Sequence, residues 1–338
     1  QVESTDGYKG AQEYLMSLKM DPATGEIPVE AVIKAREEVT QMQMARSSAT
    51  DVVWKEMGPD NVGGRTRALL IDKDNSDKMF AGGVSGGLWV STNAGFNWSL
   101  VPGTDALSFS GIVSMCQTSN GDIYIGTGEG ETANNGGTSN GATGMIGGGI
   151  YKSTNGGATF EHLESTIPSS MISTTFTFAA VTEMAAHATD PNTVYAATGN
   201  GLQLTTDGGA TWTAATNPVT FLDVEVASNG YVYASTANKI YSSSTGEVGS
   251  FDFVDMSVFG SGSGRIELAI APSDQSYIYA VYSNAGGLGR YKGIYRSTDS
   301  GMTWEELIPG WDGSTPPVYN IFNQQANYAM TIAVDPAN

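Results

Sequence analysis

The stretch Gly-Leu-Trp-Val-Ser-Thr-Asn-Ala-Gly-Phe-Asn-Trp, residues Gly87–Trp98, decides the fold because versions of it return along the chain. Further copies are Gly149–Phe160, Gly201–Trp212 and Gly293–Trp304, and a degenerate copy occupies Lys239–Phe251. From copy to copy the repeat advances by 38 to 62 residues. A repeat of roughly 40–50 residues that contains strands and no helices is typical of β-propeller blades.

Each full copy has the pattern of a strand, a tight turn and the start of a second strand. The apolar strand ends in two hydroxyl residues, and the Asn or Asp that follows can accept backbone N–H bonds and close the turn. Two residues later a Gly suits a positive φ, and an aromatic residue then opens the next strand and packs between blades. We therefore expect a structural role for Asn93, Gly95, Trp98, Asn155, Gly157, Phe160, Asp207, Gly209, Trp212, Asp299, Gly301 and Trp304.

A second recurring unit precedes each copy. Ala185–Ala197 and Leu268–Ala280 both contain an apolar strand, a polar turn and another apolar strand. The two units together make four strands per blade, which we call A to D from the inside outwards. Because successive strands run antiparallel, the A–B and C–D turns share one face and the B–C and D–A loops share the other. The sequence thus predicts an all-β fold, a multi-bladed propeller of four-stranded blades.

The two ends of the chain depart from this repeat. Residues 1–50 have the pattern of a short helical N-terminal arm, and residues 51–338 that of a propeller with five blades and the start of a sixth. Val52–Met57 is similar to the D strands, so we expect it to complete the last blade and remove an exposed edge. Tyr328–Asn338 matches only the A strand and turn of a sixth blade, so we expect the propeller to be incomplete at its C-terminus.

Charge and composition exclude several classes of partner. The 338 residues carry 35 acidic and 16 basic side chains, a formal net charge of -19, which argues against nucleic acid as a partner. No apolar run is long enough for a transmembrane segment. A single cysteine, Cys116, and two distant histidines, His162 and His187, argue against a metal site, and we expect neither metal nor cofactor.

The composition also bears on localisation. The chain starts at Gln1 without a signal peptide, and its low charge and abundant Ser, Thr, Asn and Gly suit a secreted or bacterial cell-surface protein. We expect a mature chain from which the signal peptide has already been removed.

Four motifs link the chain to a known group. They are Trp54–Pro59, Gly63–Arg65, Gly86–Trp89 and Gly126–Glu129. With the repeated turns they resemble the Asp-box (BNR-repeat) β-propellers, in particular the bacterial sortilin-N-terminal-like or glycosyl-hydrolase-like group, over residues 52–338. The helical preface is similar to those of secreted Bacteroidetes surface proteins, which implies export by the type IX secretion machinery.

The longest loops fall on the face of the B–C and D–A loops, where binding sites are commonly built. Glu129, Asn134 and Asn135 lie in such a loop and are candidate ligand-binding residues. Glu129 could bind a ligand, or it could cap backbone N–H groups or hold a structural cation.

Three arginines stand at the starts of A strands and therefore near the same face. Arg65, Arg67 and Arg265 could bind a ligand carboxylate in a bidentate manner, or pair with the excess acidic groups of neighbouring blades.

The resemblance implies three functions. The first is a non-catalytic binding module for a glycan or protein ligand, the second a family 74-like glycoside hydrolase acting on polysaccharide, and the third a sortilin-like channel that binds peptide. Sialidase activity is disfavoured because Thr66-Arg67-Ala68 follows Arg65 in place of the sialidase motif. Val84 and Ser85 stand where family 74 enzymes carry a catalytic Asp, which argues against the hydrolase.

Overall fold

The computed structural model describes residues 65–84, 86–104, 111–130, 145–170, 173–259, 264–284, 290–309 and 330–335, with a few isolated positions before residue 40. The predicted closing strand Val52–Met57 and almost all of the predicted helical arm lie outside these described residues.

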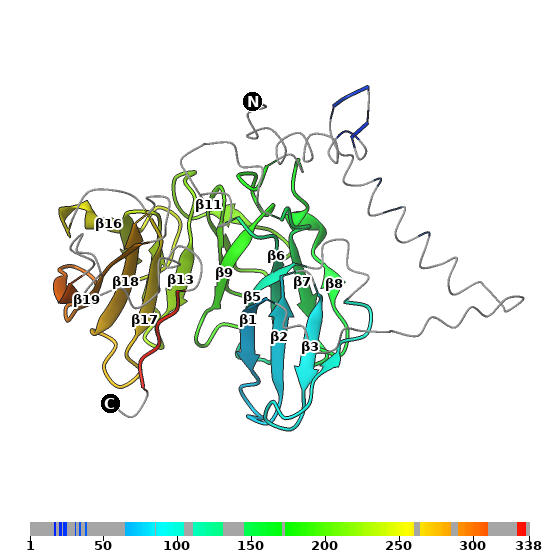
Figure 1. The fold of residues 1–338 in the computed structure, drawn as a ribbon, viewed down its shortest axis with the longest axis horizontal. Coiled ribbons are helices and arrows are strands. Elements are labelled where there is room, and N and C mark those ends of the chain that lie inside the picture. The colour runs from blue at the N-terminus through cyan, green and yellow to red at the C-terminus, as the bar shows by residue number, and fades with distance from the viewer. Residues whose placement is uncertain are drawn as a thin grey trace, which may run out of the picture.

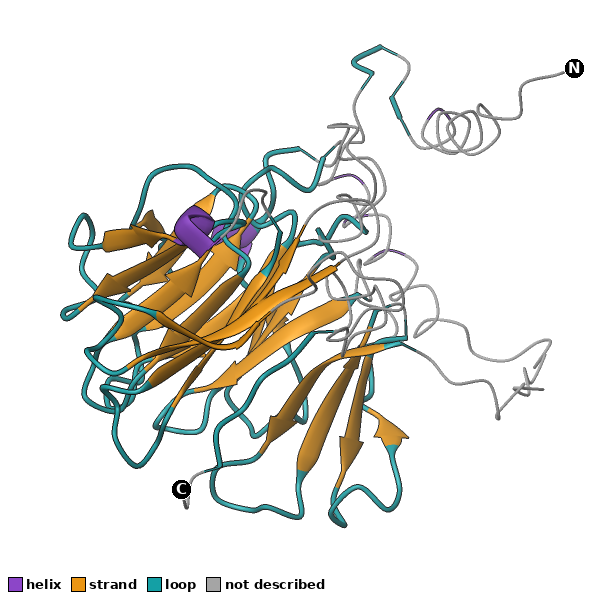
Figure 2. Cartoon of the chain, turned by 60° about the vertical axis from the view of Figure 1, so that its left-hand side comes forward, coloured by secondary structure: helices purple, strands orange, loops and turns teal. Residues whose placement is uncertain are grey.

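The described strands form five antiparallel four-stranded sheets, each a meander in chain order (Figures 1 and 2). Blade 1 contains β1 (Thr66–Ile71), β2 (Met79–Gly83), β3 (Leu88–Ser91) and β4 (Ser99–Leu100); blade 2 contains β5 (Ile112–Gln117), β6 (Ile123–Thr127), β7 (Ile150–Ser153) and β8 (Glu161–His162). Blade 3 contains β9 (Val181–Ala186), β10 (Val194–Thr198), β11 (Gly201–Thr205) and β12 (Thr213–Ala214). Blade 4 contains β13 (Asp223–Val226), β14 (Val232–Ser235), β15 (Lys239–Ser243) and β16 (Asp252–Asp255); blade 5 contains β17 (Ile266–Ile270), β18 (Ile278–Asn284), β19 (Arg290–Ser297) and β20 (Glu305–Pro309).

The predicted all-β propeller with four-stranded blades is confirmed. The inner strands β1, β5, β9, β13 and β17 contact one another in that order and lie side by side through the middle of the molecule (Figure 1). The helical elements within the blades are two short 3-10 turns, Glu164–Thr166 and Met256–Phe259. Among the described residues, no helix is long and apolar enough to cross a membrane.

The turns between the third and fourth strands, the C–D turns, share one hydrogen-bond pattern. In blade 2 the Ser153 hydroxyl accepts the Gly157 N–H at 2.8 Å, and Asn155 Oδ1 accepts the Thr159 N–H at 3.0 Å. Blades 1, 3 and 5 make the same bonds around Asn93, Asp207 and Asp299. The glycine two residues after the Asn or Asp has a φ of 82° to 96° in these four blades, which L side chains rarely adopt. Aromatic residues Trp98, Phe160, Trp212 and Trp304 directly precede the fourth strands.

Blades 1 to 4 are each joined to the next blade by an aromatic side chain from their second strand. Phe80, Tyr124, Tyr195 and Tyr233 occupy equivalent positions in β2, β6, β10 and β14, and all four are 0–2% exposed. Each reaches the C–D turn of the following blade. The Tyr124 and Tyr195 hydroxyls donate to the carbonyl oxygens of Gly208 and Gly246 there, at 2.9 and 3.2 Å.

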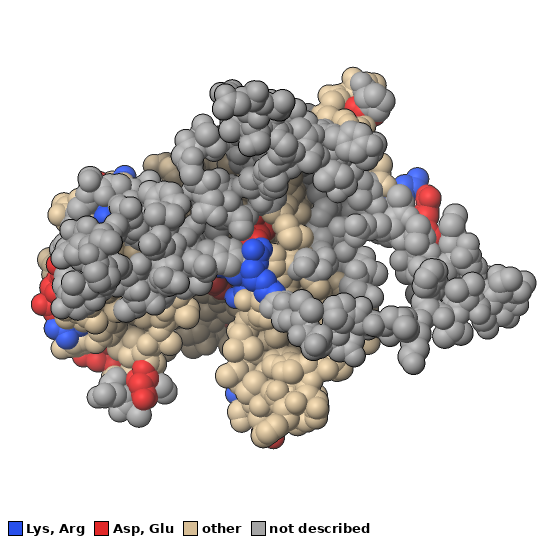
Figure 3. Space-filling view, in the orientation of Figure 1, with Lys and Arg blue, Asp and Glu red and all other residues tan. Residues whose placement is uncertain are grey.

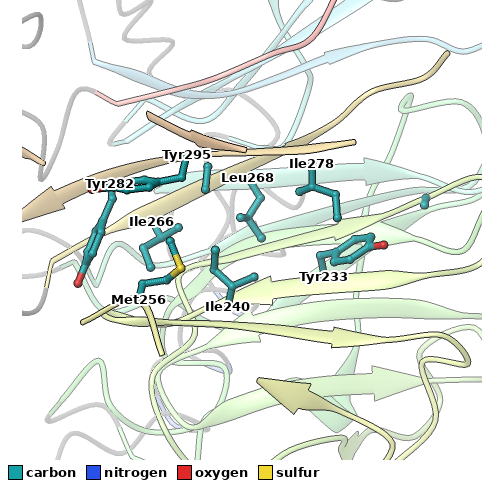
Figure 4. Close-up of a cluster of buried hydrophobic side chains, with 10 residues drawn as sticks. Tyr233, Ile240, Met256, Ile266, Leu268, Ile278, Tyr282 and Tyr295 are labelled. Atoms are coloured by element: carbon teal, nitrogen blue, oxygen red, sulfur yellow. The ribbon is translucent and has the colours of Figure 1, made fainter. Parts of the chain in front are cut away.

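Apolar side chains fill the space between adjacent blades. Between blades 4 and 5, Ile240 and Met256 face Ile266, Leu268 and Tyr282 (Figure 4). Equivalent layers lie between blades 1 and 2 and between blades 3 and 4. The core is therefore a series of interfaces between blades.

The segment 330–335 packs on the side of blade 5 that faces away from blade 4. Met330 is 5% exposed and contacts Val281 and Tyr291. Val281 of β18 occupies the position that Gly82 has in β2. Gly82 lies against Ile112, the first residue of the inner strand of the next blade, so Met330 contacts blade 5 where a following blade would pack. Residues 330–335 form no strand, and a sixth blade stays a prediction.

Substitution of two glycines with the same backbone angle can distinguish the cost of backbone strain from the cost of overpacking. Gly103 and Gly157 both have a φ of +82°, but an added Cβ meets open space at Gly103 and overlaps the Phe80 ring at Gly157. We expect Gly157→Ala to lower the free energy of unfolding by about 1–3 kcal/mol more than Gly103→Ala, because only the former overpacks a blade interface. Denaturant unfolding of the two variants measures this difference, and equal losses would contradict the packing of Phe80 against the turn.

Candidate functional site

An ion pair lies at the edge where inner strands begin and second strands end. Glu129 follows β6 of blade 2, Arg65 precedes β1 of blade 1, and the Arg65 guanidinium donates to Glu129 Oε2. The Arg65 side chain is 44% exposed, whereas the Glu129 side chain is 2% exposed. The second carboxylate oxygen, Glu129 Oε1, is buried and has no hydrogen-bond partner among the described residues. This carboxylate therefore has one oxygen fixed by a cation and one buried oxygen unsatisfied.

Glycines hold Glu129 in this position by allowing three backbone segments to meet. Gly128 has a φ of +89°, and a Cβ there would lie 2.5 Å from Gly147 N and would also overlap Ala179 O. Glu129 itself donates its N–H to the Met145 carbonyl at 2.7 Å. Larger residues at Gly128 would separate these segments and displace the carboxylate.

Arg265 is the counterpart of Arg65 in blade 5. The Arg65 carbonyl accepts the Val84 N–H at 3.0 Å, and the Arg265 carbonyl accepts the Ser283 N–H at 2.8 Å, so the two arginines start their blades in the same way. Arg265 forms an ion pair with Glu267 and is buried. Arg65 and Arg265 therefore both pair with acidic groups of the protein itself.

Further carboxylates project from the inner strands. Glu183 of β9, Asp223 of β13 and Glu267 of β17 pair with Ala197, Ser235 and Val281 of their neighbouring second strands. These are equivalent positions, and blades 1 and 2 have the small residues Ala68 and Ser114 there.

The inner-strand carboxylates form one electrostatic group, which we call the axial cluster: Glu183, Asp223, Glu225 and Glu267 with Arg67 and Arg265. Burial raises the pKa of Glu183 to about 8, the negative charge of Glu267 adds to the rise, and Arg265 and Arg67 oppose it. Burial and the neighbouring Glu183 charge likewise raise the pKa of Glu225. Groups from blades 1, 3, 4 and 5 thus act on one another near the centre, where Figure 3 shows basic side chains flanked by acidic ones.

Within the axial cluster, Asp223 forms a hydrogen bond between two inner strands. It is 3% exposed, and its Oδ2 accepts the Leu268 N–H of the next inner strand at 2.6 Å. Burial and the charges of Glu225 and Glu183 raise its pKa. This carboxylate therefore joins blades 4 and 5 at the centre.

The structure brings together part of the predicted binding set. Arg65 meets Glu129, and Arg67 and Arg265 both act on Glu183. Asn134 and Asn135 lie outside the described residues.

Sequence reasoning missed the four acidic members of the axial cluster. Three of them, Glu183, Asp223 and Glu267, could have been found from an acidic residue at one repeat position of the inner strands in three consecutive blades, inside otherwise apolar segments.

Other candidate reactive groups are structural in the described part of the chain. No group of three or more His, Cys, Asp or Glu side chains there is arranged to hold a metal ion. Cys116 is buried, and burial raises the pKa of its thiol, which disfavours the nucleophilic thiolate. His162 stacks on Tyr151 with ring centroids 4.4 Å apart.

Five four-stranded sheets with neighbouring inner strands define a β-propeller protein. A family model described as a two component regulator propeller matches residues 106–129, which include β5 and β6. No curated protein matches the chain.

Solved structures share the fold. An ancestral GH74 enzyme is 21% identical with a TM-score of 0.54, over 74% of this chain and 34% of that one. The GH74 xyloglucanase from Xanthomonas campestris is 18% identical with a TM-score of 0.52, over 74% of this chain and 40% of that one. The chain therefore spans well under half the length of these structures, and the similarity establishes a β-propeller fold alone.

The raised pKa of Glu183 predicts a pH dependence of stability. Its pKa is about 8 in the folded protein against an ordinary value of 4.5, so between these pH values the folded state binds a proton that the unfolded state has released. The contribution of Glu183 to the free energy of unfolding is therefore complete below pH 4.5 and is lost as the pH rises toward about 8. Denaturant unfolding across this range should show a steeper decline for the wild type than for Glu183→Gln. Parallel profiles would contradict the assignment.

Proposed function

We propose that this chain is a non-catalytic binding module of a secreted or bacterial cell-surface protein. Its ligand is a glycan or a protein segment that docks over the Arg65–Glu129 pair. The observation that carries the proposal is the buried, unsatisfied oxygen Glu129 Oε1 beside a cation that is 44% exposed.

The pair offers a donor and an acceptor side by side. A ligand hydroxyl or amide N–H that reaches Glu129 Oε1 satisfies a buried acceptor, and removing that penalty favours binding. The exposed part of the Arg65 guanidinium can donate to a neighbouring ligand oxygen. Adjacent hydroxyls of a sugar and the two sides of a peptide bond both present this complementary pattern.

The same pair is poorly suited to glycoside hydrolysis. Hydrolases of the usual kind need two carboxyl groups on either side of the scissile bond, one of them a protonated acid. Glu129 is instead paired with a cation, and Val84, at the position expected for a family 74 carboxylate, is a 3% exposed apolar side chain.

One observation favours a glycoside hydrolase as the second candidate. Glu183 and Glu225 are neighbouring carboxyl groups with raised pKa values, and a raised pKa is what a general acid at neutral pH requires. Arg67 and Arg265 act against the rise at Glu183, which is consistent with a structural axial cluster. A sortilin-like peptide channel differs from the first proposal in its ligand.

Localisation belongs to the same proposal. The composition supports a secreted or surface protein, and the similarity of the preface to those of Bacteroidetes surface proteins supports export by the type IX secretion machinery.

A glycan array and a peptide array, probed with the purified chain, test the module. We expect Glu129→Gln to weaken binding by about tenfold or more, because it removes the negative charge from the contact with the ligand and from the pair with Arg65. Glu305→Gln is the matched control: it breaks the Arg296–Glu305 ion pair on the outer strand of blade 5 and should leave affinity unchanged. Equal effects of the two variants would contradict a site at Glu129.

Turnover assays on xyloglucan, mixed β-glucans and sialosides separate the two candidates. We expect binding without release of reducing sugar or sialic acid. Turnover that disappears in Glu183→Gln would establish the hydrolase and overturn the module. Binding to peptides alone would identify the sortilin-like ligand class.

A further inference from the structure

An open pocket of about 540 Å³ lies between blades 4 and 5 on the face of the A–B and C–D turns. Its walls are Asn229 and Tyr231 of blade 4 and the A–B turn 272–276 and Ser300 of blade 5. This face is opposite to the one that carries the Arg65–Glu129 pair, because successive turns of a meander alternate between faces. The pocket is therefore separate from the site proposed above.

At two other interfaces a lysine ammonium fills the corresponding place. Between blades 1 and 2, Lys78 Nζ donates to the Gly156 carbonyl at 2.6 Å and lies 5.4 Å from the centre of the Phe80 ring. Between blades 2 and 3, Lys152 Nζ donates to the Gly208 carbonyl at 3.2 Å.

The second lysine has the same kind of surroundings as the first. Lys152 Nζ lies 5.1 Å from the centre of the Tyr124 ring and 3.0 Å from Asp122 Oδ2. A C–D turn carbonyl, the inter-blade aromatic ring and, here, a carboxylate thus make an ammonium site inside the fold.

Blades 4 and 5 retain the acceptors of this site but carry no lysine at these positions. Tyr231 occupies the position of Lys78 directly before the second strand, and Ser242 occupies that of Lys152 opposite the aromatic residue. Ser300 takes the place of Gly156 and Gly208 and has the same left-handed backbone, with a φ of 58°. Among the described residues, no group donates a hydrogen bond to the Ser300 carbonyl.

The aromatic ring of the site is present as Tyr233. Its hydroxyl is buried and donates to no turn carbonyl among the described residues, whereas the equivalent hydroxyls of Tyr124 and Tyr195 do. Burial raises the pKa of the Tyr233 phenol to about 12, an effect that the Ser300 side chain partly offsets. The Tyr231 and Tyr233 rings stack at 6.3 Å between centroids, which places a second aromatic ring at the pocket.

A carboxylate completes the set. Asp274 Oδ1 accepts the Ser276 N–H and hydroxyl at 3.1 and 2.7 Å, while Oδ2 accepts no hydrogen bond within the described part of the chain. These bonds lower the pKa of Asp274, so its charge is present at neutral pH. Gln275 Oε1 accepts the Asn229 N–H at 2.8 Å and thereby holds the two walls together.

We propose that this pocket binds a primary ammonium group, supplied by the lysine side chain of a partner or by a small alkylamine. The ammonium donates to the Ser300 carbonyl and hydroxyl and to Asp274 Oδ2, and it lies beside the Tyr231 ring. It takes the place that Lys78 and Lys152 fill within the chain. Charge-assisted hydrogen bonds and cation–π contacts stabilise it.

Saturation-transfer NMR with the full chain tests the site. The probes are Nα-acetyl-lysine methylamide and the matching norleucine compound, which lacks the ammonium. We expect the lysine probe alone to bind, with a Kd on the order of 1–10 mM, as befits one small polar group. Equal binding of the norleucine probe, or no binding of either, would overturn the proposal.

Variants locate the binding. We expect Asp274→Asn to weaken the lysine probe at least about fivefold, and Tyr231→Lys to abolish its binding while raising the melting temperature, because the new side chain occupies the site. Asp252→Asn, which removes an exposed acidic group of β16, is the control for net charge and should change neither quantity. Unchanged binding in both Asp274→Asn and Tyr231→Lys would exclude this pocket.

An internal standard comes from Lys78→Ala, which opens the equivalent site between blades 1 and 2. Its melting temperature should fall and be restored in part by n-propylamine, the fragment that the substitution removes. Rescue there without any binding to the wild-type pocket would overturn the proposal. A lysine tripeptide that binds more tightly than n-propylamine would identify a partner's lysine as the source, and equal affinities would identify small amines.

Discussion

The contact of an aromatic ring with a left-handed glycine turn is the constraint on which the rest of this propeller depends. Phe80 against Gly157 shows both halves of it: the turn needs a positive φ for its own hydrogen bonds, and the ring needs a residue without a Cβ. A sheet with only four short strands cannot bury both of its faces alone. The aromatic residue and the glycine fix the position of each blade on the next, and the apolar layers fill in around them.

Local chemistry explains what the sequence could predict. The turn around Asp207 depends on hydrogen bonds between residues four positions apart, so its pattern is visible in the chain. The axial cluster depends on the alignment of inner strands from different blades. Glu183 and Glu267 are 84 positions apart in sequence, and their interaction follows from strand register, which single residues do not encode. The Arg65–Glu129 pair lies between these cases, because repeat position brought both residues to one face without showing that they meet.

Charge is distributed unevenly between the centre and the surface of the molecule. With a formal net charge of -19, the chain carries an excess of carboxylates, and four of them stand among buried inner strands. Protons and two arginines offset that charge at the centre. At the turn face, by contrast, exposed Asp274 keeps its charge because its hydrogen bonds favour the ionised form. Acidic side chains thus link neighbouring blades at the centre, as Asp223 does, and at the turn face Asp274 forms part of the proposed ammonium site.

The joint between blades also has a direction, since each blade offers an aromatic ring forward and a glycine turn backward. Tyr279, the residue of blade 5 equivalent to Phe80, is only half-buried, whereas the four rings that meet a following turn are buried. Identical joints make the blade a unit of duplication and deletion: a gene segment that encodes one whole blade carries both halves of the connection. Blade number in such proteins can therefore change during evolution without new interface residues, while the loops diverge freely toward different ligands.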